Sequence, residues 1–227
     1  MISRTERWAP IGGIAFVVCM VVGSMLVGDI PKPDASRGEI TRYLADADNH
    51  VRNIAGAYLW VVGALMFLWF LTRLRNDLRR AEGGTGALST LAFGGGVAFA
   101  AVWMVSAVLF AAVPYAVEWR DAPVTNIDMV RVLPPAGRML LLLGGGFAAL
   151  LILIAASAVI LRTALLPRWL GWLGIVAALL LVFDATYQTI FPFWVWVFIA
   201  SCVMLTRREQ TQRDRTVPEV AEMRSAR

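Results

Sequence analysis

Long apolar stretches alternate with short polar ones along almost the whole chain, and this alternation sets the predicted elements. An α-helix rises about 1.5 Å per residue and the hydrocarbon layer is about 30 Å thick, so a crossing helix needs roughly 20 mostly apolar residues. The stretches lack the apolar and polar alternation of barrel strands, so each is predicted to be a helix. Four stretches are long enough without further argument: 8–27, 54–72, 87–113 and 139–161.

The stretch 169–206 needs a turn, because its 38 residues would form one helix of about 57 Å. The turn is expected at 187–192, where Pro192 is tolerated in the first turn of a new helix. The two resulting spans, 169–187 and 190–206, bring the total to six. We therefore predict an all-α, six-transmembrane-helix bundle over residues 1–206, followed by a polar, disordered cytoplasmic tail at 207–227.

The two longer connections are predicted to face outward. The first is predicted to contain a regular helix and the second to be mostly irregular. In the first, Ser36 and Glu39 fit a capping box, which predicts an amphipathic helix at the outer surface. The apolar residues of this helix follow helical spacing: Ile40, Tyr43, Leu44, Ala47 and Val51. The second connection, 114–138, is rich in proline and is predicted to be irregular, with a short helix near 126–132.

The basic residues decide the orientation. Cytoplasmic loops carry an excess of Lys and Arg, and in a six-span chain both termini lie on one side. Fourteen of the 21 basic residues fall on that side: Arg4, Arg7, Arg73, Arg75, Arg79, Arg80, Arg162, Arg168, Arg207, Arg208, Arg213, Arg215, Arg224 and Arg227. Both termini are therefore predicted to be cytoplasmic. The four arginines from 73 to 80 have a second interpretation, the attraction of anionic lipid head groups.

Composition supports a membrane protein, since 59% of the residues are hydrophobic and only 16% are charged. The net charge of +5 does not indicate nucleic acid, because the arginines flank apolar stretches. With Lys32 as the only lysine, the composition is typical of a bacterial genome of high GC content. Cys19 and Cys202 lie inside apolar stretches, so neither a disulfide, a metal site nor a cofactor is expected.

Asp184 is the only acidic residue inside a predicted span, and an ionisable group in a membrane is a candidate functional site. Tyr187 and Gln188 follow three and four residues later and share its helix face, so the three residues form a candidate ion or ligand site. The competing interpretation is a polar residue that fixes the end of a helical hairpin near the outer surface.

The glycine runs at 94–96 and 144–146 lie inside apolar stretches, so they cannot cradle a phosphate. They are predicted instead to let helices approach closely, through small residues spaced four apart. The pairs are Gly94 with Ala98, Gly96 with Ala100, Gly144 with Ala148, and Gly174 with Ala178.

Enzyme machinery is not visible in the sequence. His50 is the sole histidine and is interpreted as a solvated loop residue, with a metal or pH-sensing role as the alternative. An enzyme would need carboxylates of the outer loops to converge: Asp34, Asp48, Glu118 and Asp121. Most tryptophans lie near span ends and are interpreted as interfacial anchors, among them Trp8, Trp119, Trp169 and Trp194.

The segment Pro-Arg-Trp-Leu-Gly-Trp at 167–172, together with Asp-Ala-Ser-Arg-Gly-Glu-Ile from Asp34, resembles a group of small multi-pass membrane proteins common in actinobacteria. The resemblance covers most of the six-helix region and implies no catalytic residue.

The expected function is therefore that of a non-enzymatic protein of the cell membrane, whether accessory, lipid-interacting or structural. The alternatives are a small transporter or channel that uses Asp184, Tyr187 and Gln188, and a membrane enzyme. The expected partners are the lipid bilayer and a membrane protein or second copy of the chain, but not nucleic acid.

Overall fold

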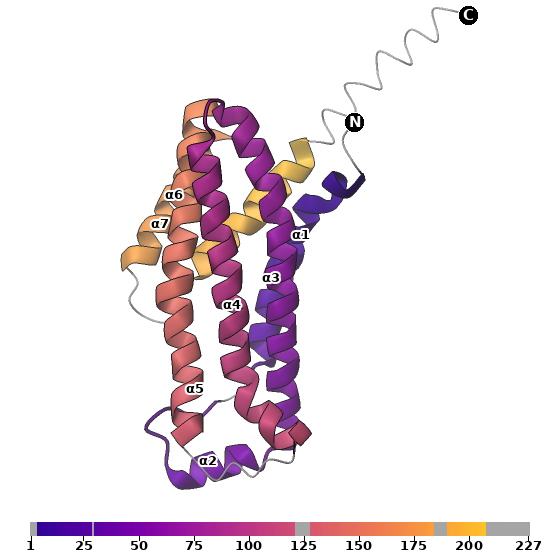
Figure 1. The fold of residues 1–227 in the computed structure, drawn as a ribbon, viewed down its shortest axis with the longest axis vertical. Coiled ribbons are helices and arrows are strands. Elements are labelled where there is room, and N and C mark those ends of the chain that lie inside the picture. The colour runs from indigo at the N-terminus through magenta and orange to yellow at the C-terminus, as the bar shows by residue number, and fades with distance from the viewer. Residues whose placement is uncertain (1–3, 29, 121–127, 184–189, 208–227) are drawn as a thin grey trace, which may run out of the picture.

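The computed structural model describes residues 4–28, 30–120, 128–183 and 190–207, and over these ranges it is built of helices without strands (Figure 1). The helices are α1 (Arg4–Leu26), α2 (Arg37–Leu44), α3 (Ala47–Glu82), α4 (Ala87–Arg120), α5 (Asp128–Met139), the π-helix η1 (Leu140–Gly145), α6 (Gly146–Thr163) and α7 (Arg168–Phe183). A last helix, here called the C-terminal helix, runs from Phe191 to Arg207.

Four helical segments of the described chain are long and apolar enough to cross a membrane. They are residues 9–26, 47–82, 87–119 and the continuous run of α5, η1 and α6 at 128–163. The fold is therefore that of a helical membrane protein, and the four segments overlap the first four predicted spans, whose crossing of a membrane stays a prediction. The segments α7 and the C-terminal helix are also apolar but shorter. Of the turn predicted at 187–192, residues 187–189 lie outside the described part, and Pro192 lies in the first turn of the C-terminal helix.

The long helices pack mainly as sequence neighbours, α1 on α3, α3 on α4, α4 on α6 and α6 on α7. In Figure 1, α3, α4 and the α5–α6 run stand side by side, and α2 lies across the end of the bundle where α3 begins. Phe16, Phe67, Phe99 and Phe193 come from four different helices, and their rings meet at 4.9–6.5 Å between centroids. Phe193 belongs to the C-terminal helix, so this helix contributes to the core of the bundle.

The amphipathic helix predicted in the first long connection is present as α2, and both hydrogen bonds of its capping box form between Ser36 and Glu39. Its buried residues Ile40 and Tyr43 pack with Val113 of α4 and Val130 of α5, so α2 covers the ends of two other helices. Ala47 and Val51 do not belong to it, contrary to the prediction. Asp46 accepts a hydrogen bond from the Asn49 N–H at 3.0 Å and starts α3 there instead.

Several helices extend beyond the predicted spans. The span expected at 54–72 is part of a 36-residue helix, and the stretch expected as a basic loop from Arg73 is helical as far as Glu82. An ion pair between Arg73 Nε and Asp77 Oδ2, 2.9 Å apart and four residues apart in sequence, supports this polar part of the helix. Pro114 lies inside α4, and Pro134 and Pro135 lie inside α5, so the prediction of an irregular loop is wrong for 114–120 and 133–138. The short helix predicted near 126–132 overlaps the start of α5.

Three of the four predicted glycine pairs lie at helix contacts. A Cβ on Gly96 would collide with Leu71 of α3, a Cβ on Gly174 would collide with Ser157 of α6, and one on Gly144 would touch Val102 of α4. Gly94 differs, because a Cβ there would meet nothing within 4 Å and both Gly94 and Ala98 are exposed. The packing prediction is therefore wrong for this pair within the isolated chain.

Candidate ligand-binding site

A half-open cavity of about 830 Å³ lies between helices that are distant in sequence, and Phe147 and Val182 of its lining are more than half exposed. This volume is within the range of roughly 300–1,000 Å³ that is usual for small-molecule sites. Its walls come from α1, α3, α4, the α5–α6 run, α7 and the C-terminal helix. The described lining residues are Ser24, Val27, Gly28, Ile30, Trp60, Trp103, Phe110, Arg138, Met139, Leu141, Leu142, Leu143, Gly146, Phe147, Leu150, Leu181, Val182, Ile190 and Trp194.

One wall of the cavity is the π-helix η1 and the residues that flank it. The Gly146 N–H donates to the carbonyl oxygen of Leu141, five residues back, which is the hydrogen-bond pattern of a π-helix. Leu141, Leu142 and Leu143 all line the cavity, as do Gly146 and Phe147 just beyond them. Short π-helical segments are rare and occur frequently at functional sites. The glycine run at 144–146 is predicted from the sequence to serve helix packing, and no local pattern indicates a π-helix there.

A second part of the lining is aromatic. The rings of Trp60 and Trp103 lie 5.9 Å apart, Trp60 and Phe110 5.4 Å apart, and Trp103 and Trp194 5.8 Å apart, all edge to face. The indole N–H groups of the three tryptophans are buried and have no hydrogen-bond partner within the described chain. Trp194 is therefore part of the interior, and its interpretation as an interfacial anchor is wrong. Trp119 and Trp169 are more than half exposed, as expected of anchors.

The polar side chains of the described lining are few. Ser24 contributes a hydroxyl from α1. Arg138, which is exposed, is the only charged residue among the described residues that line the cavity. From Arg138 to Leu150 the wall runs for twelve residues, which is roughly 18 Å at the rise of a helix. The described lining is therefore mostly apolar, with a single cationic group where its α5–α6 wall begins.

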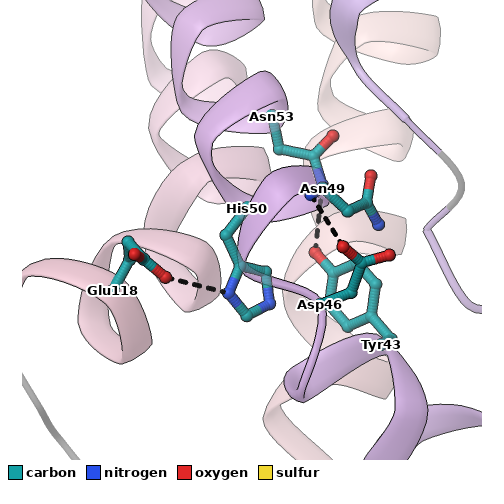
Figure 2. A network of polar contacts seen from close by, with 6 residues as sticks. All are labelled: Tyr43, Asp46, Asn49, His50, Asn53 and Glu118. Carbon is teal, nitrogen blue, oxygen red and sulfur yellow. Dashed lines mark hydrogen bonds and ion pairs between the residues drawn. The ribbon is translucent and has the colours of Figure 1, made fainter.

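A polar network joins the α1 side of the cavity to α2, and Figure 2 shows its members Tyr43, Asn53 and His50. The Gly28 N–H, on the cavity wall, donates to Asn53 Oδ1 at 2.7 Å, and Asn53 Nδ2 donates to the Tyr43 hydroxyl at 3.3 Å. Burial raises the pKa of Tyr43 to about 12, so this hydroxyl stays protonated at physiological pH. The network fixes the end of α1, the first turns of α3 and the outer helix relative to one another.

His50 lies in the same network and is not the solvated residue that the sequence analysis expected. Its side chain is 1% exposed, its Nδ1 is 3.7 Å from Glu118 Oε2, and its ring stands edge-on to Tyr43 at 5.4 Å. Neither ring nitrogen has a hydrogen-bond partner within the described residues. One face of α3 is buried and carries residues at helical spacing: His50, Asn53, Ala57 and Trp60. This spacing is the sequence pattern that indicates the burial of His50.

The outer-loop carboxylates that an enzyme would need are described only in part. Asp34 and Asp48 are exposed, Glu118 faces His50, and Asp121 lies outside the described residues. Among the described residues, no three His, Cys, Asp or Glu side chains are placed to hold a metal ion.

The predicted site of Asp184, Tyr187 and Gln188 falls wholly outside the described residues. The described residues on either side of it in sequence, Leu181, Val182 and Ile190, line the cavity. The site itself therefore remains a prediction. Its residues are adjacent in sequence to residues that line the cavity.

No protein-family model matches the chain, and comparison with curated proteins and with solved structures gave no match.

Proposed function

We propose that the chain is a six-span protein of the bacterial cell membrane that acts without catalysis by holding a membrane lipid inside its helical bundle. The four long apolar helices support the membrane location. The two shorter apolar helices, α7 and the C-terminal helix, are the proposed fifth and sixth spans. The excess of arginine beside the predicted inner ends of the spans supports cytoplasmic termini.

The observation that carries this proposal is the cavity itself. Its lining is apolar and aromatic over most of its length, and the only charge on its described walls is at one end. Interiors of proteins are otherwise closely packed, so an apolar space of this size has the character of a binding site. A lipid acyl chain is the apolar molecule that a membrane supplies in the greatest amount.

The experiment blocks the cavity at Gly146. This residue lines the cavity, and a Cβ there would meet no atom within 4 Å, so a larger side chain can enter the space without displacing backbone. The variant Gly146→Leu should lose the lipid that co-purifies with the wild-type protein in mild detergent, as measured by native mass spectrometry.

Gly94→Leu is the matched control, because Gly94 is also helical and also has no atom within 4 Å of its missing Cβ, but it does not line the cavity. It should keep the bound lipid. Equal lipid occupancy in the wild type and in both variants would contradict the proposal, since the lipid would then be bound elsewhere.

A second candidate function is the transporter or channel predicted from Asp184, Tyr187 and Gln188. It is favoured by one observation, that Leu181 and Ile190 on either side of this segment line the cavity. For this function, Asp184→Asn should abolish substrate- or proton-dependent flux into proteoliposomes without lowering expression. Unchanged flux in that variant would exclude it. The resemblance to the actinobacterial group is compatible with either function and stays a prediction.

A further inference from the structure

Arg138 distinguishes one end of the cavity from the other. It is the last charged residue before an uninterrupted apolar wall that continues through η1 to Leu150. An arginine is positively charged at every physiological pH, and its guanidinium carries five N–H donors, so it can bind a ligand in addition to any protein partner.

The chemistry of a guanidinium selects the ligand group that it binds best. Carboxylates and phosphates accept two parallel N–H donors from arginine, and such charge-assisted hydrogen bonds are about twice as strong as neutral ones. A zwitterionic head group presents the same phosphate together with a cation of its own, which weakens its net attraction to Arg138. The cavity end is therefore suited to a net anionic head group.

The dimensions of the cavity agree with a lipid that stands in one leaflet. The apolar wall beyond Arg138 is roughly 18 Å long, and half of a hydrocarbon layer is about 15 Å. A head group bound at Arg138 thus places its chain along η1, in the space that Trp103 and Trp194 also line. Arg138 lies in the last turn of α5, the helix whose residue Val130 packs against Ile40 and Tyr43 of α2.

We propose that the lipid held in the cavity is an anionic one and that Arg138 binds its head group. This inference rests on the proposed function, because it assigns the chemical class of the ligand at the same site. Ser24 and Gly28, which line the cavity on the α1 side, contribute polar groups but no charge.

The test uses the full chain in micelles that contain equal amounts of phosphatidylglycerol and phosphatidylcholine with identical acyl chains. Native mass spectrometry gives the ratio of the two bound lipids. The wild type should prefer phosphatidylglycerol by about fivefold or more, and Arg138→Gln should reduce the ratio to near one while total lipid binding persists. Arg138→Lys keeps the charge and should retain most of the preference.

Arg52→Gln is the matched control, since Arg52 is an exposed arginine of α3 near the same end of the bundle and does not line the cavity. It should keep the wild-type ratio. A wild-type ratio near one, or a ratio that Arg138→Gln leaves unchanged, would overturn the assignment of an anionic ligand while leaving lipid binding intact. A wild-type protein that binds neither lipid would instead contradict the proposed function.

Discussion

Asn53 connects three parts of the molecule through a single buried side chain. It accepts from the Gly28 N–H and donates to Tyr43, so its replacement by leucine would leave a buried hydroxyl and a backbone N–H without partners. Each buried polar group without a partner lowers the free energy of unfolding by about 1–3 kcal/mol. We therefore expect Asn53→Leu to have a lower thermal unfolding midpoint in detergent than the wild type.

The matched comparison is His50→Leu, one helical turn earlier. His50 is equally buried, but neither of its ring nitrogens has a hydrogen-bond partner within the described chain. Replacing it therefore removes an unsatisfied polar group, and we expect a smaller effect on the midpoint than for Asn53→Leu. A larger loss in His50→Leu would show that its contact with Glu118 stabilises the protein more than the Asn53 network does.

Glu39 makes the outer helix sensitive to acid. Hydrogen bonds from the backbone N–H and the hydroxyl of Ser36 hold the pKa of Glu39 below its ordinary value of 4.5. Because the folded pKa is depressed, the contribution of this cap to stability is complete above pH 4.5 and is lost as the pH falls through the folded pKa.

We therefore expect hydrogen-exchange protection of α2, corrected for intrinsic exchange, to decrease between pH 6 and pH 3. Glu39→Gln can still accept the Ser36 hydrogen bond but does not titrate, and its protection should not change over this range. An identical pH dependence in both proteins would assign the effect to another group.

Residues in local motifs were predictable from the sequence, whereas residues in long-range contacts were not. The capping box of Ser36 and Glu39 needs only three residues of separation, and it was predicted correctly. The hydrogen bond from Gly28 to Asn53 spans 25 positions and depends on how α1 meets α3, which no local pattern contains. His50 was assigned to a loop because its polar neighbours concealed its place on a buried helix face.

At the scale of the elements, close contact between α1 and α3 depends on two glycines. A Cβ on Gly56 would lie 2.7 Å from the Gly23 carbonyl oxygen, and backbone cannot move aside as a flexible side chain can. We expect Gly56→Ala to destabilise the protein by about 1–3 kcal/mol through overpacking. Thermal unfolding in detergent measures the change.

Gly94→Ala is the control for this prediction, because a Cβ at Gly94 meets open space. Alanine forms helices better than glycine by roughly 0.5–1 kcal/mol, so Gly94→Ala should be neutral or slightly stabilising. If Gly94→Ala were as damaging as Gly56→Ala, Gly94 would be in contact with another molecule, such as a second copy of the chain.

The elements themselves were predictable to different degrees. The apolar stretches identified the four long helices, because hydrocarbon leaves a backbone no alternative to helical hydrogen bonds. The helix ends were missed, since α3 and α4 continue into polar sequence where apolar length carries no information. Pro114 was taken as a loop residue, yet α4 continues through it to Arg120. The π-helix η1 differs from an α-helix by one inserted residue, and its leucines and glycines fit either form.

At the scale of the whole molecule, the cavity exists only when six segments come together. Trp60, Trp103 and Trp194 are separated by many residues and belong to three helices, so the sequence gives no sign that they share a wall. The candidate residues predicted from sequence, Asp184, Tyr187 and Gln188, were chosen as polar groups in an apolar span. That criterion finds isolated charges, but it cannot find a site whose lining is mostly apolar.

The proposed topology makes a prediction for the two ends of α3. This helix has 36 residues, so it is roughly 54 Å long and exceeds the hydrocarbon layer of about 30 Å at both ends. The positive-inside rule places the arginine-rich end in the cytoplasm, and α2 must then be external.

With Cys19 and Cys202 replaced by alanine, a cysteine introduced by Asp34→Cys should react with a membrane-impermeant maleimide in intact cells. One introduced by Thr85→Cys, in the exposed turn after α3, should react only after permeabilisation. The reverse pattern would invert the topology, and labelling of both positions in intact cells would show that α3 does not cross the membrane.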